Sequence, residues 1–586
     1  MLKLKKKTAE LIAAAVCEKF GEGLISADEA FEMLEYPPDS TMGDLALPCF
    51  RLSKSLRKAP PVIAATLGDA IKCEEFSSIS VAGGYLNFKI DPTAFSKRVV
   101  SDVLSLGEKY GSPMDGVGKK VVLDYSSPNV AKPFHIGHLG TTVIGHSLKL
   151  LHEFAGYDCF GINYLGDWGT QFGKLILAYK LWGDKAVIED GGVDELVKLY
   201  VRINNEIGAE EAASVAGLSD EEAKEKKHSD LADKARAEFA KLEAGDEESL
   251  ELWRWFVAVS LEEYEKTYKL LNIEFDSYKG ESFYTDKMPA QVEKLRNMGL
   301  LEIDDGASIV NLDKWNMPVC LILKRDGTTL YPTRDIAAAV YRKEAYGFDK
   351  AIYVTSAAQS LHFAQWIKVV ELMGYEWHDQ IVHVPYGTVS IGGAKLATRT
   401  GNVILLKDLF REAISRVYEI AKDKHPDQEE CRAIAEKVGV GAIVFHYLSN
   451  NRMRDINFIM EDALSFDGNT GPYAQYTYAR TCSVLEKASE GEMTDAELGE
   501  LEFTLAKTLA TFPERIKAAI AEYEPSIVTR YILDLAAAFN RFYHDCKIAT
   551  CEDAALRSSR IALTRATNTV LKTALRLICM QSPEKI

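Results

Sequence analysis

The sequence predicts an α/β protein centred on a doubly wound parallel sheet, with an α+β module before it and an all-α bundle after it. The run VVLDYS at 121–126 is of the continuous apolar kind that buried parallel strands use, and a glycine-bearing loop follows it directly. Apolar residues then recur at helical spacing from Leu139 to Phe154, completing a strand–loop–helix unit. From about residue 405 helical periodicity dominates to the end.

Each segment is predicted from its own pattern. Residues 1–112 mix helical and strand-like runs and end in ISVAGGYLNFKI, where a glycine pair breaks a strand pattern, so a separate α+β domain is expected. Residues 118–404 carry the sheet, and about 185–275 is dense in Glu, Lys and Ala, which predicts solvated helices inserted into it. The runs VCLILKRDG, AIYVTS and IVHVPYGTVSI are expected to supply the second half of the sheet. Residues 405–465 are predicted to form a connecting helical region, and 466–586 an all-α bundle.

Composition excludes several classes of protein. Lys and Arg number 69 against 86 Asp and Glu, so a general polyanion binder is not expected, although a local basic groove remains compatible. The basic start MLKLKKKTAELIAAAVCEKF is predicted to be an amphipathic helix, because its apolar run is too short for a signal peptide. No segment has the roughly 18 unbroken apolar residues of a membrane span. The ten cysteines are scattered and contain no CxxC pair, so neither a disulfide framework nor a zinc site is expected. Together with the lack of a membrane span, this favours a cytoplasmic protein with no membrane partner.

The loop after the first predicted sheet strand, SSPNVAKPFHIGHLGTTVIGH, contains His135, Gly137 and His138. A glycine-bearing loop that leads into a helix offers free N–H groups and the positive end of the helix dipole to an anion. Two imidazoles three residues apart at that turn favour a nucleotide triphosphate. A metal-binding pair and a purely structural pair are the alternatives that the spacing alone leaves open.

Several motifs resemble those of class I aminoacyl-tRNA synthetases, and specifically of the arginyl-tRNA synthetase family. They are SSPNVAKPFHIGHL, NYLGDWGTQFGKL, LYPTRDI and GNTGPYAQYTYAR, with the ending ALRLICMQSPEKI. The likeness covers nearly the whole chain. It implies a Rossmann-like catalytic domain and a DALR-type anticodon-binding bundle. It also implies a monomer that uses ATP and Mg²⁺ to convert L-arginine into arginyl-adenylate and pyrophosphate, then transfers arginine to the 3′-terminal adenosine of tRNA(Arg).

The resemblance assigns phosphate binding to two signatures. In the HIGH signature, the expected phosphate-binding residues are His135, Gly137 and His138, with Lys132 just upstream. The counterpart of the KMSKS loop reads GGAKLATRTGN, in which Lys395 takes the first lysine position and a threonine replaces the second lysine. Lys132 is expected to compensate for that loss, and Arg399 adds a cation. A solvated loop lysine is the alternative for Lys395.

A guanidinium substrate needs carboxylates and carbonyl or phenol oxygens. The resemblance implies that Asp335 binds the guanidinium, and an N-cap of the following helix is the alternative for this residue. Asn163 is expected to bind the amino acid or only to shape its loop. The other arginine-binding residues implied by motif match are Asp124, Asn129, Tyr331 and Gln359.

The resemblance also implies tRNA contacts at both ends of the chain. Tyr85 and Asn87 match positions that recognise a D-loop base, and a packed strand aromatic is the alternative for Tyr85. Tyr476 and Arg480 are expected to contact the anticodon region, with core packing as the alternative for the tyrosine. The family generally continues HLR after HIGH, whereas this chain has Gly140. The rival functions are another HIGH-bearing enzyme and a non-catalytic RNA-binding relative.

Overall fold

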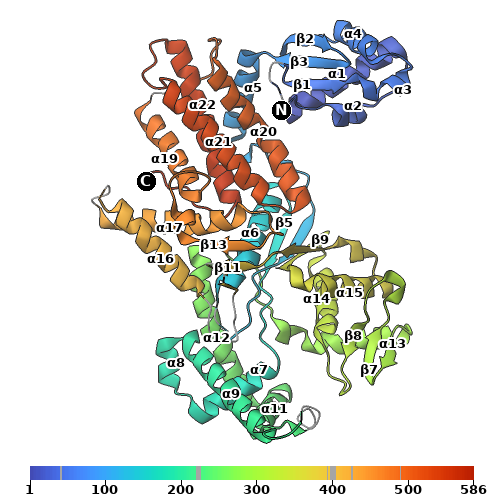
Figure 1. Cartoon of the computed structure of the whole chain (residues 1–586), viewed down its shortest axis with the longest axis vertical. Coiled ribbons are helices and arrows are strands. Elements are labelled where there is room, and N and C mark those ends of the chain that lie inside the picture. The colour runs from blue at the N-terminus through green and yellow to red at the C-terminus, as the bar shows by residue number, and fades with distance from the viewer. Residues whose placement is uncertain are drawn as a thin grey trace.

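The computed structural model describes residues 1–37, 39, 42–132, 134–219, 226–391, 394–395, 404–423, 427–488 and 490–586. A parallel sheet lies at the centre of an elongated molecule (Figure 1). The N-terminal module and the C-terminal bundle lie at one end, and two lobes extend from the other. Along the described ranges, no helix is both long and apolar enough to cross a membrane.

The central sheet has four parallel strands in the order β10-β9-β4-β5. The helix α6 (Leu139–Phe154) connects β4 to β5, as the sequence predicts. The next strand of this sheet, β9, lies on the opposite side of β4, so the order in which strands are added to the sheet reverses between β4 and β9. Ligands of open α/β sheets bind at such a switch point, beyond the carboxyl ends of the strands. The strands are β4 (Lys120–Asp124), β5 (Asp158–Ile162), β9 (Lys350–Ser356) and β10 (Ile381–Tyr386).

One of the three runs expected in the second half of this sheet lies elsewhere. VCLILK contains β8 (Cys320–Leu323), which pairs antiparallel with β7 (Ala307–Val310), and β7 pairs with β6 (Glu302–Asp304). This small sheet and α13 (Met288–Asn297) form one of the two lobes (Figure 1). Alternating apolar residues predicted the strand correctly but could not specify its partner. The lobe joins the sheet through α14 (Tyr331–Tyr346) and α15 (Ser360–Leu372).

The other lobe is the helical insertion. It has an apolar core of its own that includes Leu196, Leu242 and Phe256, so its helices are packed as well as solvated. The helices are α7 (Thr170–Trp182), α8 (Lys185–Gly191), α9 (Val193–Ser214), α11 (Asp230–Glu243) and α12 (Glu247–Leu270).

The N-terminal module packs four helices against a three-stranded antiparallel sheet of order β1-β3-β2. A fifth helix, α5, lies against the C-terminal bundle, where Phe95 meets Phe503 at a ring-centroid distance of 5.9 Å. The elements are α1 (Leu2–Phe20), α2 (Ala27–Met33), β1 (Leu45–Pro48), α3 (Ser53–Leu56), α4 (Pro60–Ala70), β2 (Phe76–Ala82), β3 (Tyr85–Ile90) and α5 (Pro92–Leu106).

From Val389 onward, the described residues are mainly helical and include three short strands. β11 (Val389–Ile391) pairs with β12 (Ala394–Lys395) and with β13 (Ile456–Phe458). One continuous apolar core joins the bundle to α6 and to the N-terminal module. The helices are α16 (Leu406–Ala421), α17 (Gln428–Leu448), α18 (Met460–Leu464), α19 (Gly471–Lys487), α20 (Glu500–Glu522), α21 (Ser526–Asp545) and α22 (Ala554–Leu577). The predicted fold class, an α/β protein with an α+β module and an all-α bundle, is confirmed.

Candidate active site

The loop that leaves β4 has an unusual backbone. Ser126, Ser127 and Ala131 have φ values of 68°, 48° and 56°, in the left-handed region that costs energy for residues with a side chain. Hydrogen bonds hold this course, because Thr141 accepts from the Ser126 N–H at 3.0 Å and Asn163 Oδ1 accepts from the Ser127 N–H at 3.1 Å. Strained backbone that is held in this way is typical of functional sites.

The two histidines of the HIGH turn are oriented by the backbone. The Gly137 N–H donates to His135 Nδ1 at 3.0 Å, and the His135 N–H donates to His138 Nδ1 at 3.1 Å. Because both Nδ1 atoms accept, each neutral ring carries its hydrogen on Nε2. The rings lie 4.0 Å apart between centroids. The turn therefore presents two fixed Nε2–H donors.

Burial keeps these rings neutral. It lowers the pKa of His135 to about 4 and that of His138 to about 3, and His135 adds to the second shift. Neutral imidazoles can donate to phosphate oxygens at physiological pH without exchanging protons with solvent. The third histidine of the stretch, His146, is buried beside Tyr125 within the fold.

The HIGH turn is hydrogen-bonded to the segment that follows the KMSKS-like loop. The Ile136 N–H donates to the Ile404 carbonyl at 3.1 Å, and the Leu406 N–H donates to the Phe134 carbonyl at 2.9 Å. The two signatures are thus joined through the backbone. Lys395 lies in β12, with Ser390 as its register partner, and Arg399 lies outside the described residues.

Gly140 leaves room for a tyrosine of the connecting region. A Cβ atom at this position would lie 2.2 Å from the Tyr447 hydroxyl and 3.0 Å from a ring carbon of Tyr386. Both phenols are buried against the first turn of α6. The departure from HLR therefore has a steric reason, because Tyr447 occupies the space that a larger residue would need.

The side of the site that is predicted to bind the amino acid contains three carboxylates, each paired with a cationic or basic side chain of the protein. At the carboxyl end of β4, Asp124 pairs with Arg342 at 2.8 Å and accepts from the Ser127 hydroxyl at 2.8 Å. Burial raises the pKa of Asp124, and Arg342 opposes that rise. The Arg342 guanidinium lies 5.0 Å from the Tyr164 ring and 5.3 Å from the Tyr353 ring, so this pair is enclosed by aromatic groups.

The second carboxylate is Glu281, which sequence reasoning missed. Its carboxylate pairs with Arg334 at 2.7 Å, and burial raises its pKa to about 7 against the opposing effect of Arg334. Burial also lowers the pKa of Lys132, while Glu281 raises it, so Lys132 lies within electrostatic reach of both sides of the site. The sequence signal for Glu281 was weak, because a lone Glu in a loop is ordinarily solvated.

The third carboxylate is Asp335, whose Oδ2 lies 2.6 Å from His362 Nε2. The N-cap alternative for Asp335 is wrong, because α14 begins at Tyr331 with Leu330 as its N-cap. Tyr331 lies one turn before Asp335 and is 67% exposed. Gln359 is exposed and directly precedes α15, the helix that carries His362. Tyr331, Asp335 and Gln359 thus lie on neighbouring helix starts.

The two asparagines predicted to bind arginine differ in their exposure to solvent. Asn163 is fully buried, its Nδ2 donates to the Tyr268 hydroxyl at 3.0 Å, and its Oδ1 accepts from Ser127. These contacts support the alternative that Asn163 shapes the loop. Asn129 is exposed, and a Cβ atom on Gly166 would lie 2.2 Å from its Oδ1, so a side chain at position 166 would displace the Asn129 amide.

The predicted tRNA residues lie on two surfaces remote from the sheet. Tyr85 is part exposed with its ring edge-on to Phe50 at 5.3 Å, whereas Asn87 is buried on the same strand. In the bundle, the Arg480 guanidinium lies 4.8 Å from the Tyr476 ring and 4.8 Å from the Tyr543 ring. Sequence reasoning missed Tyr543, which lies 63 residues beyond Arg480 in the chain and comes close only through the packing of α19 on α21.

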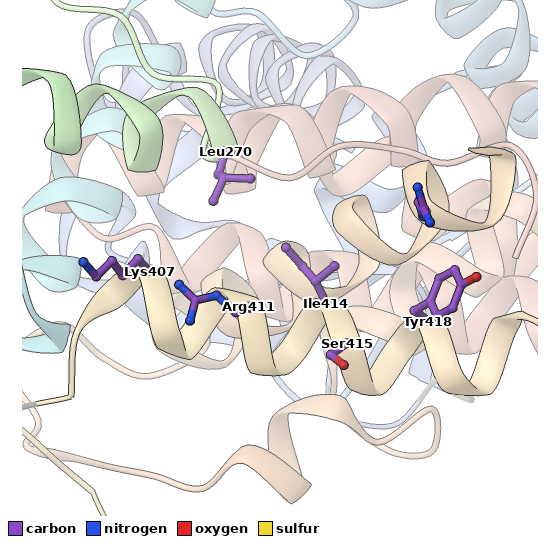
Figure 2. Close-up of a pocket in the computed structure, with 7 residues that line it drawn as sticks. Leu270, Lys407, Arg411, Ile414, Ser415 and Tyr418 are labelled. Atoms are coloured by element: carbon purple, nitrogen blue, oxygen red, sulfur yellow. The ribbon is translucent and has the colours of Figure 1, made fainter. Parts of the chain in front are cut away.

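A groove of about 460 Å³ lies along α16. Figure 2 shows Lys407, Arg411, Ile414 and Tyr418 in a row along the helix, with Leu270 opposite them. Lys407 pairs with Asp194 at 2.6 Å, and Arg411 pairs with Asp408 at 3.0 Å. The described part of the chain contains no group of three or more His, Cys, Asp or Glu side chains that could hold a metal ion.

Three family profiles match the chain in succession. Residues 3–90 match the "Arginyl tRNA synthetase N terminal domain", 99–460 match "tRNA synthetases class I (R), catalytic domain", and 474–586 match the "DALR anticodon binding domain".

Curated relatives and solved structures agree with these profiles. The arginine–tRNA ligase of Alkaliphilus metalliredigens is 48% identical over 100% of both chains, and that of Clostridium perfringens is 47% identical over 95% of this chain and 96% of its own. The fold is that of the arginyl-tRNA synthetase of Thermus thermophilus, with a TM-score of 0.78 at 23% identity over 100% of both chains. The Plasmodium falciparum enzyme gives a TM-score of 0.77 at 22% identity, covering 100% of this chain and 99% of its own. The chain therefore belongs to the arginyl-tRNA synthetase family, and its activity is that of an arginine–tRNA ligase.

Proposed function

We propose that the HIGH turn binds the ATP phosphates through neutral donors. His135 and His138 direct Nε2–H groups at the oxygens on which charge develops when the arginine carboxylate attacks the α-phosphate and pyrophosphate leaves. Fixed donors of this kind stabilise a transition state without reorganising. Lys132 supplies a positive charge beside them, and Lys395 with Arg399 binds the β- and γ-phosphates from the KMSKS-like loop.

The substrate guanidinium is bound at the open end of the three carboxylates. Their side chains are 7%, 16% and 23% exposed at Asp124, Glu281 and Asp335. This gradient is the observation that carries the assignment, because a ligand can reach Asp335 without displacing a buried guanidinium. Tyr331, Gln359 and Asn129 complete the exposed wall. Asp124 and Asn163 act indirectly by holding the Ser127 turn.

The family binds tRNA and arginine, and class I synthetases use ATP and typically Mg²⁺. We propose that Mg²⁺ arrives bound to the ATP phosphates, whose charge it shields. Residues 118–404 perform the chemistry, and 405–465 join them to the tRNA-binding bundle at 466–586. Tyr476 and Arg480 offer a stacking surface there, and the part-exposed ring of Tyr85 offers one in the 1–112 domain, whereas Asn87 is buried and could reach RNA only after a local rearrangement.

The basic face of the α16 groove is assigned to the backbone of the same tRNA, because it adjoins the segment that pairs with the HIGH turn. The protein acts as a cytoplasmic monomer, which sedimentation with and without tRNA(Arg) tests.

The decisive variant for the arginine side is Asp335→Ala. A lost charge-assisted hydrogen bond is worth about 1.5–3 kcal/mol, so the KM for arginine is expected to rise about 10- to 100-fold while the KM for ATP changes little. Pyrophosphate exchange in the presence of tRNA(Arg) measures both constants. A larger effect on ATP than on arginine would reassign this carboxylate to the nucleotide.

A further inference from the structure

Asp335 is not free in the folded chain, because His362 lies against it. A carboxylate only accepts hydrogen bonds, so the 2.6 Å contact requires a hydrogen on His362 Nε2. The two residues lie near the starts of α14 and α15, which pack together. Their side chains are 23% and 26% exposed, so solvent and ligand reach both.

We propose that His362 is a positioning residue that sets how strongly Asp335 binds the arginine guanidinium. The inference rests on the proposed role of Asp335. Neutral His362 donates to Oδ2, fixes the plane of the carboxylate and leaves Oδ1 of the anionic group to accept from the substrate. Protonated His362 forms an ion pair with Asp335 and competes with the incoming guanidinium for the same charge. Arginine binding therefore weakens as His362 gains its proton.

Other titratable groups lie close to the Asp335–His362 pair and could contribute to the pH dependence of arginine binding. His383 on β10 lies near His362 and is held neutral, because burial lowers its pKa to about 4 with a further effect of Arg452. Phe363 stacks on His383 at 4.2 Å and meets His362 edge-on at 5.7 Å, so aromatic groups cover these ring faces. On the Asp335 side, Glu281 has a pKa of about 7. Glu281 therefore titrates near neutral pH, and its effect on arginine binding must be separated from that of His362 in any test.

The test compares the wild type with His362→Gln, whose side-chain amide keeps a donor for Asp335 but cannot be protonated near neutral pH. The dissociation constant of L-arginine is measured by calorimetry between pH 8 and pH 5.5, where histidines ordinarily titrate. The ratio of the wild-type constant to the His362→Gln constant is expected to rise about tenfold over this range. The contribution of Glu281 is present in both proteins and cancels in the ratio.

Two further variants make the outcome decisive. His383→Gln, the matched neighbour, is expected to show the pH dependence of the wild type. Asp335→Asn is expected to weaken arginine binding at pH 8. If Asp335→Asn has no effect, the proposed site of the guanidinium fails. If it weakens binding but the His362→Gln ratio stays constant with pH, the role of His362 alone is overturned. His362→Asn repeats the measurement if His362→Gln does not fold.

Discussion

The two sides of the active site are prepared for their ligands in opposite ways. The side that we propose for the ATP phosphates has neutral imidazoles, each oriented by a backbone N–H, so its Nε2–H donors are fixed in the folded chain. The amino-acid side uses carboxylates that already have partners in Arg342, Arg334 and His362. Hydrogen bonds preorganise the first side. On the second side, the substrate guanidinium must compete with side chains of the protein for the carboxylates. Mutations should therefore act on the rate at the first side, and on affinity or stability at the second.

The largest effect is expected from His138→Ala. Removal of one preorganised donor to a developing oxyanion typically costs about 10²–10³ in kcat, so pyrophosphate exchange with tRNA(Arg) present should slow by that factor. The control is His544→Ala, which changes an exposed histidine of the bundle. Because the pKa values of His135 and His138 are about 4 and 3, neither should contribute an inflection to the wild-type kcat between pH 6 and 8. An intact rate in His138→Ala would mean that the imidazole is structural.

The second effect concerns stability at the buried end of the carboxylates. Arg342→Met leaves Asp124 buried without its cation, and loss of one partner of a buried pair costs about 3–5 kcal/mol. We expect a clear fall in the thermal midpoint of the catalytic region. Asp335→Asn, at the exposed end, should change stability by less than about 1 kcal/mol. The double variant Arg342→Met/Asp124→Asn should recover much of the loss. Equal losses of stability in Arg342→Met and Asp335→Asn would contradict the increase in exposure from Asp124 to Asp335.

The smallest effect is expected in the open groove along α16, where the Arg411 side chain is 72% exposed. Arg411→Glu should raise the KM for tRNA(Arg) several-fold and reduce the salt dependence of binding by about one phosphate contact. The matched control is Arg416→Glu on the same helix, where the arginine pairs with Glu412 and Glu461 and does not line the groove. Filter binding at several salt concentrations measures both slopes. Identical salt dependences of binding for the two variants would mean that the groove does not contact the tRNA.

Local patterns predicted the strand–loop–helix unit around the HIGH turn, because its residues are neighbours in the chain. The strand, the loop and α6 follow one another as expected, and His135 and His138 lie in the 3₁₀ turn directly before α6. The amino-acid side depends on contacts between distant elements. Arg342 meets Asp124 from more than 200 residues away, and no spacing rule connects Glu281 to Arg334. β8 was assigned to the wrong sheet for the same reason, since alternation specifies a strand and not its neighbour.

The contact between Gly140 and Tyr447 links two positions that lie in different regions of the sequence. Any lineage that acquires a bulky residue at 140 must first give up the phenol at 447, and a lineage that keeps the tyrosine can tolerate only glycine opposite it. These two sites should therefore change together among relatives. A graft of the HIGH segment from another synthetase into this chain should fail unless residue 447 is exchanged with it.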